Sequence, residues 1–146
     1  MALKFQVQLK IQKPVAEVFD GVANPKKLSG YFVQYASGPL AQGTTVKWKF
    51  PEFPGEHDVV VREVIKDERI VFEWAVGEGG YDIRVEMVFK PLDAQNTMVQ
   101  ISETGWRDDP KGLESSYGNC GGWMHMVTCL KAYLEYGINL RAGGAV

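Results

Sequence analysis

Residues 121–137 read GGWMHMVTCLKAYLEYG, and their spacing is that of one amphipathic helix. At 100° per residue, the large apolar side chains of this stretch fall within a single arc. They are Trp123, Met126, Val127, Leu130, Leu134 and Ile138. Tyr133 borders the arc, Gly137 lies inside it, and His125 lies almost opposite. The stretch therefore predicts a helix that packs one stripe against a sheet, with Gly137 permitting a close approach and His125 at the surface or at an interface.

The chain before this helix is dominated by strand patterns. Apolar and polar side chains alternate, as in half-buried strands, over residues 3–11, 46–50, 59–65, 70–76, 81–90 and 97–106. The sequence GEGG at 77–80 supplies the glycines that a hairpin turn needs. Pro14 and the apolar face that follows it predict a short helix, which ends at Asn24-Pro25, and a second short helix at 26–28.

This order of elements predicts an α+β domain. Helices are segregated from an antiparallel sheet, and no segment alternates as βαβ units would. A length of 146 residues suits one domain with its own core. We assign residues 1–141 to that domain and 142–146 to a flexible tail. Because Gly143-Gly144 carries no periodic pattern, residues 141–146 are expected to be dispensable.

Three stretches together carry a family resemblance. KPVAEVFDGVANPKKLSGYF at 13–32 enters a helix from a strand, VVVREVIKDERIVFEW at 59–74 joins two strands through an acidic turn, and GWMHMVTCLKAYLEYG at 122–137 opens the helix on Gly-Trp. They resemble the Hsp90 ATPase activator homologue family of the START/Bet v 1-like (SRPBCC) superfamily. The resemblance implies a helix-grip fold, in which a curved antiparallel sheet of about six strands wraps around a long C-terminal helix. It also implies an apolar cavity between sheet and helix that holds a small hydrophobic or lipid-like molecule.

The predicted cavity wall combines large aromatic side chains with methionine, which suits an adaptable apolar pocket. The candidate ligand-binding residues are Trp48, Phe50, Phe72, Trp74, Val85, Met87, Glu103, Trp123, Met126 and Leu130. The alternative is that the same side chains fill a solid core. Periodicity does not separate these two interpretations, and the resemblance favours the cavity.

Two acids, Glu63 and Glu103, share the parity of the inward-facing apolar residues on their strands. A carboxylate inside an apolar cavity would have a raised pKa and would suit ligand orientation or proton transfer. The alternatives are that a β-bulge turns either acid outward, or that it pairs with Arg84 or Arg107. If the scaffold is instead an enzyme, a cyclase or a hydrolase, Glu103 and His57 are the weak candidates for acid or base. A chaperone-interacting stress-response module is the third hypothesis, which a pull-down with an Hsp90-type chaperone would test.

Other function classes find no support in the composition. The net charge of −2 and the absence of a basic run argue against nucleic-acid or membrane partners. Cys120 and Cys129 would lie on opposite sides of a helix, about 13 Å apart along its axis, which predicts two free thiols. With two histidines and no cofactor motif, we expect no metal and no cofactor. We expect a cytoplasmic protein. A homodimer and a contact with a chaperone both stay open, because no motif in the sequence indicates either.

Overall fold

The computed structural model describes residues 2–76 and 80–146. Its elements are β1 (Leu3–Ile11), α1 (Val15–Ala23), α2 (Pro25–Leu28), β2 (Tyr35–Ala36), β3 (Thr45–Lys49), β4 (Glu56–Ile65), β5 (Arg69–Ala75), β6 (Asp82–Asp93), β7 (Asn96–Trp106) and α3 (Pro110–Tyr136). The first three residues of the predicted turn at 77–80 lie outside the described residues. Among the described residues, no helix is both long and apolar enough to cross a membrane.

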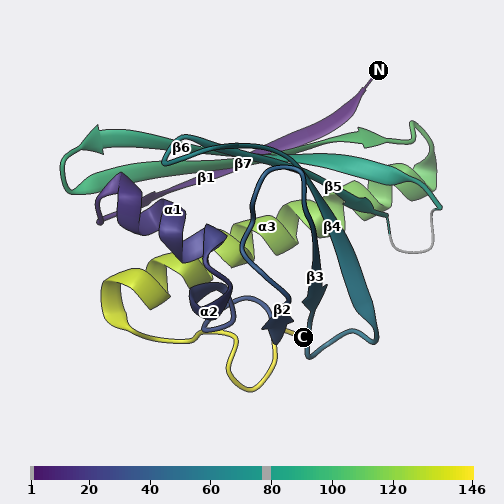
Figure 1. Ribbon diagram of the computed structural model, residues 1–146. Coiled ribbons are helices and arrows are strands. Elements are labelled where there is room, and N and C mark those ends of the chain that lie inside the picture. Colours follow the sequence, from purple (N-terminus) through teal and green to yellow (C-terminus); the bar gives the residue numbers. More distant parts are fainter. Residues whose placement is uncertain (1, 77–79) are drawn as a thin grey trace.

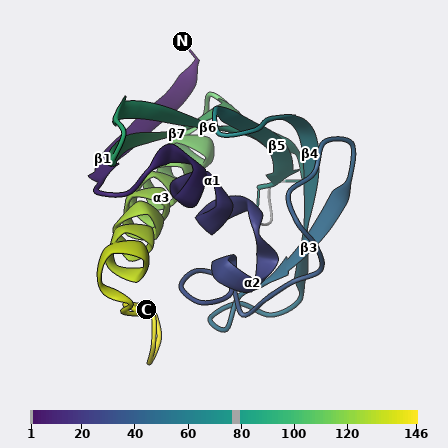
Figure 2. The same cartoon turned by 60° about the vertical axis from the view of Figure 1, so that its left-hand side comes forward.

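The strands form one antiparallel sheet in the order β1-β7-β6-β5-β4-β3-β2. The strand that begins the chain pairs with the last one, so that Val7 of β1 lies opposite Ile101 of β7. Figures 1 and 2 show the sheet curving around α3, with α1 beside the C-terminal half of that helix. The predicted helix-grip fold is confirmed. The sheet has one strand more than the expected six, because β2 is only two residues long and too short to show alternation.

Helix α3 buries the stripe that the sequence predicts, including Trp123, Met126 and Leu130. The helix begins at Pro110, well before residue 121. The Asp109 carboxylate caps this end by accepting a hydrogen bond from the backbone N–H of Gly112 at 2.7 Å. Its first turns are rich in polar residues and glycine, and they carry no apolar stripe from which the start could be predicted.

The predicted C-terminal end of the stripe is wrong. The helix ends at Tyr136, and Gly137 is its cap, with a left-handed φ of 68° that glycine adopts without strain. Gly137 therefore terminates α3 and does not bring it close to the sheet. Ile138, which was expected in the stripe, follows the cap and is 50% exposed.

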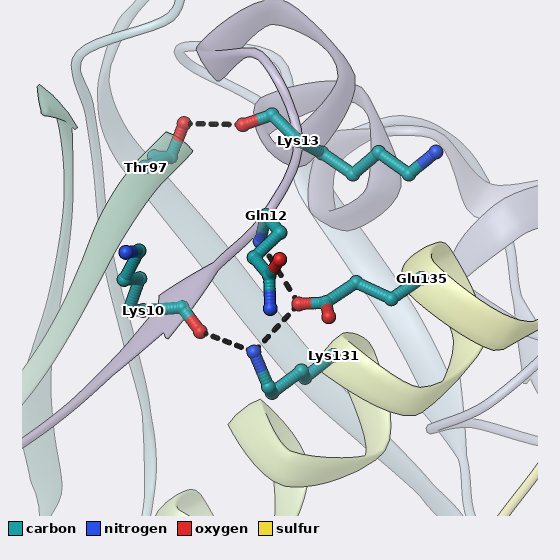
Figure 3. A network of polar contacts seen from close by, with 6 residues as sticks. All are labelled: Lys10, Gln12, Lys13, Thr97, Lys131 and Glu135. Carbon is teal, nitrogen blue, oxygen red and sulfur yellow. Dashed lines mark hydrogen bonds and ion pairs between the residues drawn. The ribbon is translucent and has the colours of Figure 1, made fainter. Parts of the chain in front are cut away.

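Polar contacts fix the C-terminal half of α3 to the end of β1 (Figure 3). Lys131 Nζ donates a hydrogen bond to the carbonyl of Lys10 at 2.9 Å and forms an ion pair with Glu135 at 2.7 Å. The Glu135 carboxylate also accepts the backbone N–H of Gln12 at 2.9 Å. These bonds satisfy edge-strand groups and hold the helix at this end, far from its first turns.

Of the alternatives left open for Glu63, an inward-facing carboxylate or one turned outward by a β-bulge, the structure has the β-bulge. The register of β4 against β5 shifts between Val61 and Glu63, so a β-bulge interrupts the alternation on which the prediction rested. The Glu63 carboxylate is half-buried and lies 3.7 Å from Arg69 Nη1. Cys120 and Cys129 are both unpaired, as predicted, and Cys129 is buried.

Candidate ligand-binding cleft

A cleft of about 680 Å³ lies between the N-terminal half of α3 and the end of the sheet where β4 begins and β5 and β7 end. We call it the aromatic cleft, because rings dominate its walls. The aromatic side chains that line it are Phe32, Phe50, Phe53, Trp74, Tyr81, Trp106 and Trp123. Its helix wall is formed largely by small residues, among them Ser115, Gly118 and Gly122.

The small residues of α3 leave room for the cleft. Gly118 and Gly122 are one helical turn apart, and a Cβ added at either would meet no atom within 4 Å. Gly112 is different, because a Cβ there would collide with the backbone carbonyl of Arg107. That glycine is required where the chain entering from β7 crosses the first turn of α3.

The Glu103 carboxylate lies fully buried behind the cleft wall. Its Oε2 accepts hydrogen bonds from Trp123 Nε1 at 2.7 Å and from Trp74 Nε1 at 3.2 Å, and its Oε1 accepts one from Asn119 Nδ2 at 3.0 Å. Burial raises the pKa of this carboxyl, although the three donors partly oppose the rise. The two indole rings are 5.4 Å apart between centroids, and the shared acceptor fixes how both are turned. Glu103 therefore fixes the orientation of Trp74 and Trp123 in the cleft wall without itself facing the cleft.

His57, at the beginning of β4, lines the cleft and carries a polar atom without a partner in the described part of the chain. Its ring packs 5.5 Å from that of Phe50, measured between centroids. Its Nε2 is buried and has no hydrogen-bond partner among residues 2–76 and 80–146. If the ring turned so that Nε2 faced the cleft, that atom would offer a donor or an acceptor to a ligand, depending on the tautomer.

Arg141 closes another part of the cleft. Its guanidinium forms an ion pair with Glu52, and the two side chains are only 11% and 5% exposed. The guanidinium carbon lies 5.5 Å from the centroid of Phe32 and 6.0 Å from that of Phe50, within the range of cation–π attraction. Arg141 Nη1 also lies 3.4 Å from His125 Nδ1. The chain beyond α3 thus returns to the cleft.

These contacts correct two expectations. Residues 141–146 were expected to be dispensable together, but Arg141 is packed and paired, whereas the dispensability of 142–146 stays a prediction. His125 was expected at the surface, but it is half-buried beneath Arg141, and its Nε2 lies 3.5 Å from Cys129 Sγ. A single arginine after a helix has no periodicity, so nothing in the sequence signalled its place.

The structure divides the predicted ligand-binding residues into two groups. Phe50, Trp74 and Trp123 line the aromatic cleft, and Glu103 bonds to two of them. The others are packed in the core, as the solid-core alternative proposed: Trp48, Phe72, Val85, Met87, Met126 and Leu130. The sequence reasoning missed several lining residues, among them Phe32, Tyr81, Trp106 and Asn119. Most of these lie outside the alternating segments or at strand ends, where periodicity carries little information.

Comparisons with known proteins agree with this architecture. The family model described as "Activator of Hsp90 ATPase homolog 1-like protein" matches residues 12–135. No curated protein sequence matches the chain. The structure of protein SSP2350 from Staphylococcus saprophyticus is 24% identical, with a TM-score of 0.80 over 95% of this chain and 96% of that one.

Two further structures show the same fold. DynU16, a protein in the dynemicin biosynthetic locus, is 23% identical, with a TM-score of 0.79 over 92% of this chain and 48% of its own. The Aha1 dimer from Colwellia psychrerythraea is 17% identical, with a TM-score of 0.75 over 92% of this chain and 98% of its own.

Proposed function

The chain belongs to the Activator of Hsp90 ATPase homolog 1-like family, and on that premise we propose that it binds a small hydrophobic molecule in the aromatic cleft. The observation that carries the proposal is the cleft itself. Its volume of about 680 Å³ falls within the roughly 300–1,000 Å³ typical of small-molecule sites. Aromatic rings provide a large apolar contact area with few rotatable bonds, so a ligand that packs against them loses little to side-chain ordering.

The wall residues have distinct roles in this proposal. Trp74, Trp123 and Phe50 supply apolar surface, and each ligand methylene buried against them contributes about 0.8 kcal/mol. His57 supplies the polar contact that orients the ligand when its ring turns to bring the buried Nε2 to the cleft. Glu103 is a positioning residue, because its carboxylate holds both indoles by their N–H groups and is itself sealed from the cleft.

Two neighbouring glycines of α3 allow a matched test. Both Gly121 and Gly122 are exposed, but only Gly122 lines the cleft, and a Cβ at either meets no atom within 4 Å. Leucine at either position should raise helix stability by a similar amount, about 0.5–1 kcal/mol. Only in Gly122→Leu does the new side chain enter the cleft.

The measurement is a fluorescence titration with the apolar probe N-phenyl-1-naphthylamine. The wild-type chain and Gly121→Leu should bind the probe equally, and Gly122→Leu should bind it at least about tenfold more weakly, a difference of about 1.4 kcal/mol. Equal binding by all three proteins would show that the probe lies elsewhere, and no binding to the wild-type chain would refute the proposed function.

An enzyme, a hydrolase or a cyclase, is the second candidate function, and the unpartnered Nε2 of His57 is the observation that favours it. A histidine in an apolar cleft can act as general acid or base. Hydrolysis of p-nitrophenyl esters that is abolished in His57→Gln, with probe binding retained, would support this candidate. Hydrolysis equal in wild type and variant would count against it.

We propose in addition that the chain forms a homodimer, since one protein of the same fold was solved as a dimer. Light scattering coupled to size-exclusion chromatography gives the mass in solution directly. A mass of one chain, 16.3 kDa, at all concentrations tested would contradict this.

A further inference from the structure

Arg141 lines two hollows of the molecule. One is the aromatic cleft, and the other is a hollow of about 780 Å³ bounded by the loop after α2, by Glu52 and by the residues that follow α3. Phe32 is the other side chain that lines both. The Arg141 side chain and the Phe32 ring therefore form the partition between the aromatic cleft and this second hollow.

The Arg141 part of the partition is charged and held by an ion pair. Arg141 is paired with Glu52, and both side chains are nearly excluded from solvent. Within the described part of the chain, Arg141 Nε and Glu52 Oε2 are buried without a hydrogen-bond partner. An apolar group could enter the second hollow only by displacing this buried charged pair. Separating two buried charges costs free energy, so this displacement opposes binding.

We propose that the Arg141–Glu52 pair is the end wall of the aromatic cleft and sets the greatest length of apolar molecule that the cleft admits. The inference rests on the proposed function and adds to it a class of ligand: slender apolar molecules, such as alkyl chains, up to a defined length. Arg141 is thus a residue that determines specificity, although it lies beyond the helix whose first half forms the cleft.

A homologous series of n-alkanols, from hexanol to tetradecanol, tests the wall by competition with N-phenyl-1-naphthylamine. For the wild-type chain, affinity should rise about fourfold for each added methylene and then level off at the length that reaches Arg141. In the Arg141→Ala/Glu52→Gln double variant, affinity should continue to rise, so that the longest alkanols bind at least about tenfold more tightly than to the wild type. The shortest alkanols should be unaffected.

The variants are chosen to keep the fold and to isolate the wall. Arg141→Ala alone would leave the buried Glu52 carboxylate unpaired, whereas the double variant leaves no unpaired buried charge. Arg107→Ala is the matched control, because Arg107 lines the same cleft but is exposed, with its guanidinium 4.4 Å from the Tyr81 ring centroid. It should keep the wild-type length limit. If circular dichroism shows that the double variant is unfolded, Arg141→Lys keeps a positive charge beside Glu52 but is shorter and lacks the planar guanidinium, and it should bind the longest alkanols at least about threefold more tightly.

The outcomes separate the two proposals. If the folded variant shows the same length limit as the wild type while short alkanols bind to both, the inference about the wall is overturned and the proposed function stands. A shifted limit in Arg107→Ala would also overturn it, because the limit would then not be set at Arg141. If the wild-type chain binds neither the probe nor any alkanol, the proposed function fails, and the inference fails with it.

Discussion

Replacing Glu103 by leucine or by glutamine tests how the wall of the aromatic cleft is organised. Leucine removes the acceptor of two indole N–H groups and of the Asn119 amide. A buried donor that loses its partner costs about 1–3 kcal/mol, and removal of a buried charge offsets part of the total. We therefore expect Glu103→Leu to lower the free energy of unfolding by about 2–5 kcal/mol, a large share of a typical ~5–15 kcal/mol.

Glutamine should be tolerated far better. Its oxygen can take the place of Oε2 and accept both indole N–H groups, while its amide nitrogen faces Asn119. The Asn119 amide then needs only to turn over, so that its oxygen accepts the new donor. We expect Glu103→Gln to cost less than about 1.5 kcal/mol. Urea denaturation followed by far-UV circular dichroism measures both variants without relying on tryptophan emission. Equal losses for leucine and glutamine would refute the role of Glu103 as shared acceptor.

The difference in stability between the wild-type chain and Glu103→Gln should also depend on pH. Burial raises the pKa of the Glu103 carboxyl above its ordinary 4.5, against the hydrogen bonds from Trp123, Asn119 and Trp74. The folded state thus keeps this proton to higher pH than the unfolded state, so the stability that the group contributes is complete below about pH 4.5 and is lost as the pH rises through the raised value. Glu103→Gln does not titrate here, and its stability relative to wild type should improve from about pH 4 to about pH 8. A relative loss over that interval would show that the ionised form is the one the fold favours.

Three substitutions and two truncations test the packing of α3 and of the residues after its end. Trp123→Ala should lower the free energy of unfolding by about 3–5 kcal/mol, because it empties a buried site. His125→Ala should lower it by less than about 1 kcal/mol. Urea denaturation compares the two variants, and the reverse order would mean that the helix is turned the other way. Gly137→Ala should cost about 1–2 kcal/mol, since alanine is strained at the left-handed cap, and a neutral result in thermal melting would argue against that cap. Truncation after Arg141 should leave the melting temperature nearly unchanged. Truncation after Leu140 should lower the free energy of unfolding by about 3–5 kcal/mol, because it leaves the buried Glu52 carboxylate unpaired. Equal melting temperatures for the two truncated chains would contradict the packed arginine.

The strands and the helix stripe were predictable because each has a period that burial enforces. Alternation located β1, β3 and β5 to β7, and the arc of Trp123 and Leu130 oriented α3. The bulge after Val61 broke the period in β4, and there parity misplaced Glu63. Parity did place Glu103 correctly, because β7 runs opposite β6 without a bulge at that position.

The cleft was harder to predict, because its walls come from segments without periodicity. The resemblance implied a cavity between sheet and helix, but the candidate residues came from the centre of the strands, where Phe72 and Met87 are completely buried. The cleft lies at one end of α3, where glycine and serine replace large side chains. The spacing of Gly118 and Gly122, one turn apart on a helix, was the available signal, but the same glycines also fit a later start of the helix.

The pairing of β1 with β7 has a consequence for how the chain folds. Strand β1 has no partner until β7 has been made, because Val7 pairs opposite Ile101, some ninety residues later. Helix α3 then packs chiefly against β1. The consecutive hairpins from β3 to β7 join residues close in sequence, so they can form early, while closing β1 onto β7 requires a long loop to be ordered. Until that step a nascent chain carries an unpaired edge strand, which is the part of this molecule most open to pairing with another copy.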